Sequence, residues 1–332
     1  MEPAGFTVTR RLPGATAIVS DPLRERIYVA MGSTAQKFPD SIVVLDPSTT
    51  QVVTTSPVGP NPTSLAISDD GSTLWVGLHD ASSVRKVELS GDVVVPGAEY
   101  VLPPADFAPR PHAARSMVLL PGTTASLAVT LHIDDLAPSL VGVVLLDEGV
   151  PRSLRLPGHI GASHLSRGPN GYLLGFDGGL GIYSIVVSAD GLTQTEHSNL
   201  ISGFDMDLVY DSGQLFAAGG AIVNVENPEA PFAAGHLPVE GPVFPQVAAG
   251  IAWALNGAQS HAYPAPLSLA KLELQTSSEL SSTEIGTEIL LPRSLIRSTQ
   301  GVFAFIADDP EQTKTGFGFT SGVYLVQLSE GD

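Results

Sequence analysis

The chain has 332 residues, 43% of them hydrophobic and 15% charged, so it carries enough apolar material for a large core and is not disordered over most of its length. Its 34 acidic residues outnumber 16 basic ones and give a net charge of −18, which argues against a nucleic acid or an anionic membrane surface as partner, because phosphates require a basic footprint. The absence of cysteine excludes disulfides and thiolate metal sites, and no apolar run reaches the roughly 18 residues that would favour membrane insertion.

A short apolar strand closed by an acidic or polar residue recurs along the chain. Its seven copies lie about 47 residues apart on average, which is a repeat of the propeller or solenoid kind. The copies are Ile42–Asp46, Val84–Glu88, Val143–Asp147, Ile182–Val186, Ile222–Glu226, Leu269–Glu273 and Val323–Gln327. A second apolar strand precedes each copy: Ile27–Ala30, Leu74–Gly77, Leu127–Thr130, Tyr172–Gly175, Leu215–Ala218, Ile251–Ala254 and Val302–Phe305.

Each unit also has a strand upstream, such as Thr63–Ser68, and a more polar strand downstream, such as Gln51–Thr55. Four strands in each of seven units, without a helical period, predict an all-β fold: a seven-bladed β-propeller of four-stranded antiparallel blades. The alternative, a pair of β-sandwiches, would not produce seven equivalent phrases. The last unit stops at Leu328 after three strands, so the unassigned strand Phe6–Leu12 is expected to close the last blade and remove a free sheet edge.

We expect one propeller domain over residues 1–332. The expected closing strand is 6–12, and the expected blades are approximately 14–56, 59–103, 111–157, 158–200, 203–237, 241–290 and 291–328.

Five segments follow one another within roughly the first 90 residues: Ile27–Ala30, Asp40–Asp46, Thr50–Val53, Val58–Pro62 and Asp69–Val76. They correspond in order to a "YV" strand, an "xVxVID" strand, a polar strand and a "GxxPxxxxxxxDG" segment. In this succession the chain resembles the YVTN-type β-propeller repeat family. Later units keep the strand phrases but lose the Asp-Gly turn and the Gly-x-x-Pro segment. The resemblance implies a scaffold rather than one activity, because such propellers resemble bacterial surface proteins, quinoprotein-like relatives and lactonase-like enzymes alike.

In an antiparallel meander, the loops between blades share one face with the loops that join second to third strands. The long loops of this chain fall into these two classes: Gly32–Asp40, Pro103–Pro111, His132–Ser139, Asn256–Pro266 and Asp308–Thr320. The opposite face has tight turns, such as Asp69–Ser72. Because long loops tend to carry function, we expect the working surface on the long-loop face.

Histidines and carboxylates recur at equivalent positions near that face. His79, His132 and Asp177 follow the second strands of blades two to four, whereas His112, His159 and Asp205 precede the first strands of blades three to five. With Asn61, Asn256 and Arg293 they form the candidate ligand-binding set at the mouth of the central channel. His112, His132, His159 and Asp177 are the candidate metal ligands, since imidazole with carboxylate suits Zn, Cu, Ni or Fe, or an acid–base pair. Unrelated surface histidines are the other interpretation.

Several further residues have both a functional and a structural interpretation. Asp134–Asp135 and Asp308–Glu311 offer oxygen ligands to Ca²⁺, or are merely solvated. Arg115, Arg293 and Arg297 lie in or near inner strands, where they would hold a carboxylate or pair with neighbouring Asp residues. His164 is expected in an inner strand, His197 and His236 in outer strands, Trp75 and Trp253 in the core, and Tyr263 and Phe38 in long loops that contact a ligand.

Two functions compete. The first is a non-catalytic binding scaffold that presents its long-loop face to a protein, peptide or glycan; the acidic charge favours a basic or cationic partner, and no cofactor is firmly implied. The alternative is a metal-dependent lactonase- or lyase-like hydrolytic enzyme at the channel mouth, with Ca or a transition metal. The resemblance implies acidic and amide ligands for such an ion, for which Asn61, Asp177, Asp205 and Asn256 are available. An electron-transfer partner is a third option.

The resemblance also points to a periplasmic or cell-surface bacterial protein. The segment Met1–Gly5 has neither the charged nor the apolar region of a leader, so we expect a leader to have been removed, with a cytoplasmic location as the alternative.

Overall fold

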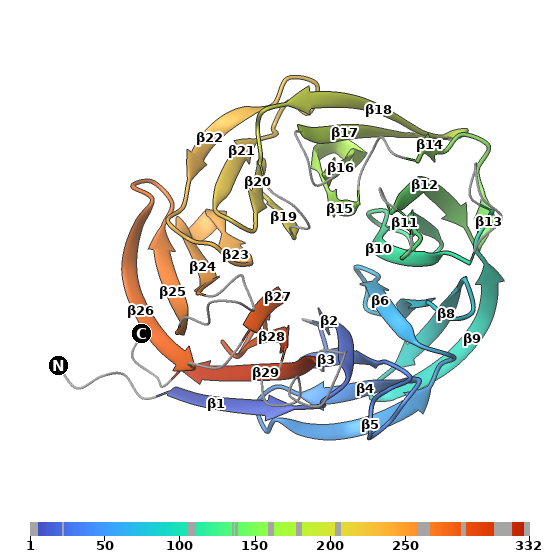
Figure 1. Ribbon diagram of the computed structural model, residues 1–332, viewed down its shortest axis with the longest axis horizontal. Coiled ribbons are helices and arrows are strands. Elements are labelled where there is room, and N and C mark those ends of the chain that lie inside the picture. Colours follow the sequence, from blue (N-terminus) through green and yellow to red (C-terminus); the bar gives the residue numbers. More distant parts are fainter. Residues whose placement is uncertain are drawn as a thin grey trace.

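Seven separate antiparallel sheets form a closed ring in the computed structural model (Figure 1). The structure describes residues 6–21, 23–104, 111–134, 136, 139–158, 163–176, 181–202, 207–257, 266–286, 290–308 and 321–328. This part of the chain contains 29 β-strands and two short 3₁₀ turns, η1 (Pro169–Gly171) and η2 (Val247–Ala249). Among these residues no helix has the length and apolar character needed to cross a bilayer.

Each blade is a meander whose first strand lies innermost. Blade one holds β2 (Ala15–Asp21), β3 (Arg26–Met31), β4 (Ser41–Asp46) and β5 (Gln51–Pro57); blade two holds β6 (Pro62–Ile67), β7 (Thr73–Leu78), β8 (Ser83–Ser90) and β9 (Val93–Val101). Blade three holds β10 (Ala113–Leu119), β11 (Ser126–His132), β12 (Leu140–Asp147), β13 (Val150–Pro151) and β14 (Leu156–Pro157); blade four holds β15 (His164–Arg167), β16 (Leu173–Phe176), β17 (Gly181–Ser188) and β18 (Gly191–Ser198). Blade five holds β19 (Leu208–Asp211), β20 (Gln214–Ala217), β21 (Ala221–Asn224) and β22 (Phe232–His236); blade six holds β23 (Val243–Gln246), β24 (Ile251–Asn256), β25 (Leu267–Glu273) and β26 (Ser278–Gly286). Blade seven holds β27 (Leu290–Arg297), β28 (Phe303–Asp308), β29 (Ser321–Leu328) and β1 (Phe6–Arg11).

The second and third strands of each blade are buried on both faces, because each blade is packed between two others. In β3, Ile27, Val29 and Met31 join the core shared with blade seven, whereas Tyr28 and Ala30 join the core shared with blade two. Seven such inter-blade cores encircle the ring, and each fully buried aliphatic side chain in them contributes about 1.5–3 kcal/mol. The ring is therefore held together by blade-on-blade burial.

The N-terminal strand closes the ring, as the sequence predicted. β1 pairs antiparallel with β29, with Phe6 opposite Leu328 and Arg11 opposite Val323. The last blade thereby acquires its fourth strand (Figure 1), and the outer edge of β29 is covered. The seven-bladed propeller and its closing strand are confirmed.

Hydroxyl side chains of the inner strands link consecutive blades across the channel wall. Thr16 Oγ1 donates to the Pro62 carbonyl (2.6 Å) and Ser64 Oγ to the Ala114 carbonyl (2.9 Å). Further round the ring, the Leu165 amide donates to Ser116 Oγ (3.1 Å). These bonds satisfy inner-strand backbone groups that have no neighbour within their own sheet on that side.

The outer strand of blade three is reduced to two short pieces. β13 pairs with the end of β12 and β14 with its beginning, and each piece contains a proline, Pro151 and Pro157. Proline cannot donate to a strand ladder, but an outer strand tolerates it because one of its edges is unpaired.

Candidate functional site

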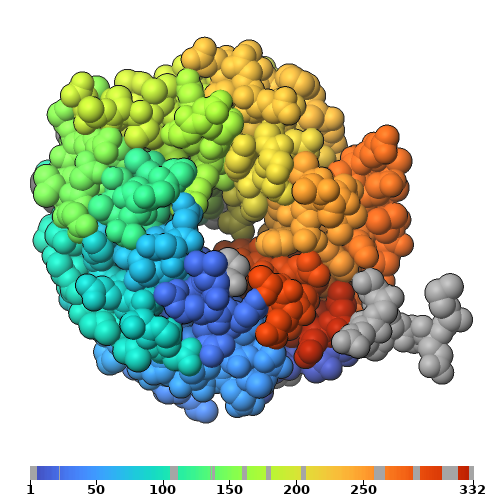
Figure 2. All heavy atoms as spheres, turned by 180° about the vertical axis from the view of Figure 1, so that it is seen from behind, coloured from blue at the N-terminus to red at the C-terminus, as the bar shows by residue number. Residues whose placement is uncertain are grey.

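The central channel opens into a cavity of about 510 Å³, within the usual range of ligand pockets. Figure 2 shows the ring hollowed at its centre. Inner strands of the first blades supply much of the wall, through Thr16–Ile18, Thr63–Leu65 and Ala113–Met117. The remaining lining residues are His79, His132, Asp134, His164, Asp207, Arg293 and Ser294.

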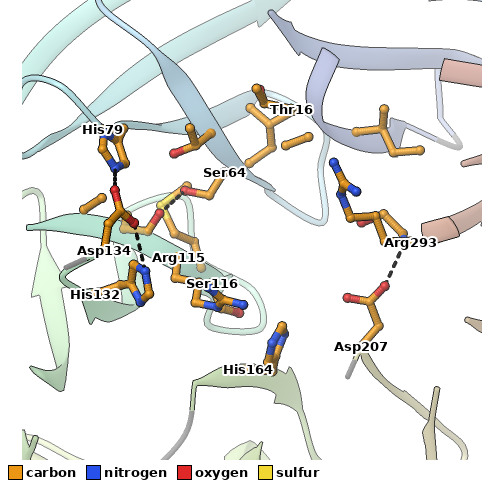
Figure 3. Close-up of a pocket in the computed structure, with 18 residues that line it drawn as sticks. Thr16, Ser64, His79, Arg115, Ser116, His132, Asp134, His164, Asp207 and Arg293 are labelled. Carbon is orange, nitrogen blue, oxygen red and sulfur yellow. Dashed lines mark hydrogen bonds and ion pairs between the residues drawn. The ribbon is translucent and has the colours of Figure 1, made fainter. Parts of the chain in front are cut away.

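A hydrogen-bonded row of polar side chains crosses three blades; we call it the rim network, made of Asp40, Asn61, Asp80, His79, Asp134 and His132. His79, His132 and Asp134 line the cavity, and the row extends from them towards blade one. His79 follows β7 and stands between two carboxylates, with its Nδ1 2.8 Å from Asp80 Oδ1 and its Nε2 2.7 Å from Asp134 Oδ2. The second oxygen of Asp134 lies 2.9 Å from His132 Nε2 at the end of β11 (Figure 3). One carboxylate thus joins the histidines of blades two and three.

The same row continues into blade one. Asn61 Nδ2 donates to Asp80 Oδ1 (3.0 Å), and the Asn61 amide donates to Asp40 Oδ1 (2.8 Å). Ser33 Oγ donates to the same Asp40 oxygen (2.6 Å). Asn61 and Asp40 both have left-handed backbone conformations, with φ of 49° and 58°, which Asn and Asp tolerate better than most residues.

The pKa values of the two histidines in the rim network are shifted in opposite directions. Burial acts to lower the pKa of His79, but hydrogen bonds to Asp80 and Asp134 outweigh it, so the pKa lies above the usual value. Burial and the nearby charge of Arg115 lower the pKa of His132, despite its contact with Asp134. His79 therefore holds a proton more strongly than an ordinary histidine, and His132 holds one less strongly.

Two carboxyl groups of the rim network, those of Asp80 and Asp134, have lowered pKa values. The Asn61 amide, followed by His79, lowers the pKa of Asp80. Burial raises the pKa of Asp134, but the hydrogen bond and charge of His79 overcome this effect and leave it below the usual value. Side chains of Asp80 and Asp134 are 50% and 57% exposed, so both present negative charge to solvent.

Blade seven contributes a second polar group to the cavity. Arg293 donates to Asp308 Oδ1 (3.2 Å) and to Ser321 Oγ (2.6 Å), so this candidate is engaged in an ion pair with a neighbouring Asp. The amide of Ser294, whose φ is 58°, donates to Asp207 Oδ2 (2.7 Å) from blade five. The Ser294–Asp207 bond connects blades five and seven across the channel (Figure 3).

The predicted site residues fall into three groups. His79, His132 and Asn61 meet in the rim network, and Arg293 lines the same cavity. His112 and Asn256 do not join them: His112 is 8% exposed with its amide on Ser82 Oγ (3.2 Å), and Asn256 ends β24 with its carbonyl accepting from Ser268. His159, Asp177 and Asp205 lie outside the described residues, as do Asp135, Tyr263 and residues 309–311.

The described residues do not fit a divalent metal. Both ring nitrogens of His79 and both oxygens of Asp134 are engaged by protein partners, and His112 and Asn256 lie away from the cavity. In the described part of the chain no three His, Asp or Glu side chains are grouped to hold an ion. We derive no chemistry through a metal at this site.

The other residues considered above have ordinary structural places. Trp75 and Trp253 are buried, as expected, and His164, His197 and His236 occupy inner and outer strands as predicted. Arg297 lies over the rings of Trp253 and Phe303. His197 Nε2 is 3.1 Å from Ser184 Oγ, but that hydroxyl donates to the Pro228 carbonyl and is buried, so the pair is not a nucleophile and base.

Asp40 and Asp80 are the residues of the network that sequence reasoning missed, and Asp134 was considered only as a calcium ligand. The available signal was positional: Asp80 directly follows His79, and Asp134 lies two residues after His132, in corresponding loops of adjacent blades. Equivalent positions in neighbouring blades are brought side by side by the repeat itself.

Comparison with known proteins supports the fold alone. No family model and no curated protein matches the chain. Solved structures similar to it include U3-55K and the RRP9 WD40 repeats, each with a TM-score of 0.63 at 15% identity. Each match covers 97% of this chain, together with 98% of the U3-55K chain and 97% of the RRP9 chain. A functionally unknown protein from Desulfotomaculum acetoxidans has a TM-score of 0.63 at 12% identity, covering 95% of this chain and 99% of its own. Ring geometry, strand pairing and these likenesses together show that the chain is a seven-bladed β-propeller.

Proposed function

We propose that the protein is a non-catalytic interaction scaffold whose rim network binds a basic segment of a protein partner. The observation that carries this proposal is the preorganised row of half-exposed carboxylates at the channel mouth, fixed in place by hydrogen bonds from His79 and Asn61. Asp40, Asp80 and Asp134 supply three carboxylates to the network, alongside the imidazoles of His79 and His132. Groups positioned in this way bind a Lys or Arg side chain without further ordering.

The charge of the whole chain acts in the same direction. A net charge of −18 attracts cationic partners over a distance of about a Debye length and repels anionic ones. A cationic peptide is therefore favoured over a neutral glycan. The likeness to WD40 propellers is consistent with a scaffold role.

The hydrolytic alternative has no comparable support. Both ring nitrogens of His79 are engaged by carboxylates, so neither is directed at the proton of a substrate, as a general base requires. Among the described residues, no hydroxyl donates to His79 or His132, so the pattern of an activated nucleophile is not assembled there.

Titration of a fluorescein-labelled peptide of alternating Lys and Gly tests the scaffold proposal by fluorescence anisotropy at low salt. We expect Asp80→Asn with Asp134→Asn to weaken binding about tenfold, because each exposed charge contact contributes up to ~1 kcal/mol. The matched control, Glu279→Gln with Glu284→Gln, removes the same charge from exposed positions of β26 and should change affinity less than twofold. Equal weakening by both pairs, or no binding to the wild type, would show that the rim is not the site.

We further propose that the chain is a YVTN-type propeller of the bacterial periplasm or cell surface. The succession of phrases in the first two blades supports this assignment. Osmotic-shock fractionation of cells that produce the protein, followed by immunodetection, tests the location. Recovery in the spheroplast interior would contradict it.

A further inference from the structure

A second cavity, of about 480 Å³, lies where the closing strand β1 meets blade one. We call it the seam cavity; it shares no lining residue with the channel. Its wall combines the end of β1 and the segment leading to β2, the loop between β3 and β4, and the start of β5. The lining residues are Arg10, Arg11, Leu12, Pro13, Gln36, Lys37, Phe38, Thr50, Gln51 and Val52.

Backbone strain is concentrated at this cavity. Among the described residues, thirteen non-glycine residues have positive φ, and ten of these are Ser, Asn, Asp or Glu. The other three, Leu12 (53°), Phe38 (55°) and Thr50 (58°), are bulky or β-branched, and all three line the seam cavity. Such residues avoid the left-handed region, at a cost of about 1–3 kcal/mol each, and strain of this kind gathers at ligand sites.

The surrounding structure holds this conformation in place. Asp40, just beyond Phe38, accepts hydrogen bonds from Ser33 Oγ (2.6 Å) and the Asn61 amide (2.8 Å), which fix the end of the loop. On the other wall, Arg11 donates to the carbonyl of Thr50 (3.3 Å). Phe38 is 36% exposed, so an aromatic ring is kept at the surface rather than buried.

Two of the cations of the seam cavity, Arg11 and Lys37, differ from most others in the described part of the molecule. Seven described Lys and Arg side chains pair with carboxylates: Arg24, Arg26, Arg85, Lys86, Arg152, Arg167 and Arg293. Among the described residues, the side chain of Arg11 bonds only to Thr50. Lys37 makes no ion pair with any described residue. No Asp or Glu occurs among the described lining residues, although the chain as a whole is strongly acidic.

We propose that the seam cavity binds a small organic anion with a flat apolar body. Its volume suits a small molecule, the guanidinium of Arg11 and the amine of Lys37 would hold a carboxylate, and the ring of Phe38 would stack on the apolar part. The acidic surroundings repel large anionic partners, which restricts the site to a small ligand.

Isothermal titration calorimetry with naphthalene-2-carboxylate tests this inference, with 2-naphthamide as the uncharged control. We expect saturable binding of one carboxylate per chain and at least about tenfold weaker binding of the amide. Arg11→Gln and Lys37→Gln should each weaken binding about five- to tenfold, because each removes a charge-assisted hydrogen bond at a partly exposed site. Lys271→Gln, which makes the same charge change in blade six, should leave binding unchanged.

Phe38→Asn separates a ligand role from a structural one. Asn adopts the left-handed region readily, so this variant should unfold at a urea midpoint no lower than that of the wild type while it binds the naphthoate about fivefold more weakly. A lower midpoint with unchanged affinity would make Phe38 a structural residue and overturn the proposal. The same conclusion follows if the wild type shows no saturable binding, or if the amide binds as tightly as the acid.

Discussion

Trp75 and Trp253 occupy equivalent places in the second strands of blades two and six, yet their surroundings differ. Each ring lies beneath a lysine of the adjacent third strand, Lys86 at 6.0 Å and Lys271 at 5.3 Å from the ring centroids. Trp75 Nε1 also donates to the Thr124 carbonyl of blade three (3.0 Å). Trp253 Nε1 is buried and has no hydrogen-bond partner among the described residues.

This difference predicts unequal costs for the same substitution. Trp75→Phe should lower the free energy of unfolding by about 1 kcal/mol more than Trp253→Phe, because only the first loses a hydrogen bond and leaves a carbonyl without its donor. Urea unfolding followed by circular dichroism measures both values. Equal costs would show that the Trp75–Thr124 bond contributes nothing to stability.

The raised pKa of His79 predicts a pH-dependent contribution to stability. A group whose pKa is higher in the folded state than in the unfolded state stabilises the fold. For His79 this stabilisation is complete below the unfolded pKa of about 6.5, and it is lost as the pH rises through the pKa of the folded state. Its partners Asp80 and Asp134 have lowered pKa values, so their contribution is present above about pH 4 and is lost as the pH falls further. The contribution of His79 is therefore greatest between about pH 4 and 6.5.

His79→Gln should accordingly cost more unfolding free energy at pH 5.5 than at pH 8.5. Urea midpoints of wild type and variant at the two pH values give the comparison. His236→Gln, on outer strand β22, serves as the control and should show no such difference. A His79→Gln cost that is independent of pH would contradict the raised pKa of His79.

Among elements, the strands were predictable from sequence and the site was predictable only in part. Runs such as Ile42–Leu45 are buried on both sides between blades, so they are continuously apolar and stand out from the turns around them. The rim network depends instead on which loop ends approach each other across blades. Asp134 was considered with Asp135 as an oxygen ligand for Ca²⁺ or as a solvated residue, whereas its partners in the structure are His79, which follows β7, and His132, at the end of β11.

His112 shows the same limit of sequence reasoning. It directly precedes β10, and equivalent placement suggested that it would face the channel with His132. In the structure its backbone is bonded to Ser82 of blade two and its ring is buried outside the cavity. The position of a residue along the repeat determines where its backbone lies. The direction of its side chain, when the residue lies between two strands, is set by the packing of the loop.

The β1–β29 pairing permits a direct test of register, because the chain has no cysteine of its own. Thr7 lies opposite Gln327, and both are exposed. Thr7→Cys with Gln327→Cys should form a disulfide under air oxidation and raise the unfolding free energy by about 3–5 kcal/mol over the reduced form, since it restricts the unfolded chain over almost its full length. Urea unfolding with and without dithiothreitol measures the gain.

A pair shifted by two residues provides the control for register. Thr9 lies opposite Leu325, so Thr9→Cys with Gln327→Cys places the two sulfurs on diagonal neighbours, about 7–8 Å apart at Cα. This pair should crosslink much more slowly. Faster oxidation of the shifted pair would mean that β1 is displaced along β29.

For the whole molecule, closure of a ring means that no blade is intrinsically the last. Blade seven combines strands from both ends of the described chain, because β1, the first described strand, is its outer strand. The other blades have the same antiparallel order and the same buried faces towards their neighbours. Stability should therefore depend on completing seven inter-blade cores rather than on which blade contains the break.

A circular permutant tests this equivalence. Joining Leu328 to Phe6 through an Asn-Gly turn makes β29 and β1 a continuous hairpin, and opening the chain between Gly91 and Asp92 leaves β9 to close blade two from the new N-terminus. We expect the permutant to keep the far-ultraviolet circular dichroism of the wild type and to unfold within about 2 kcal/mol of it, because the turn at Gly91 is exposed and has open space around it. Opening the chain between Trp75 and Val76 instead interrupts β7, which is buried throughout, and should prevent folding. If the Gly91 permutant also fails to fold, the β1–β29 junction has a role in folding that the outer strand of another blade cannot replace.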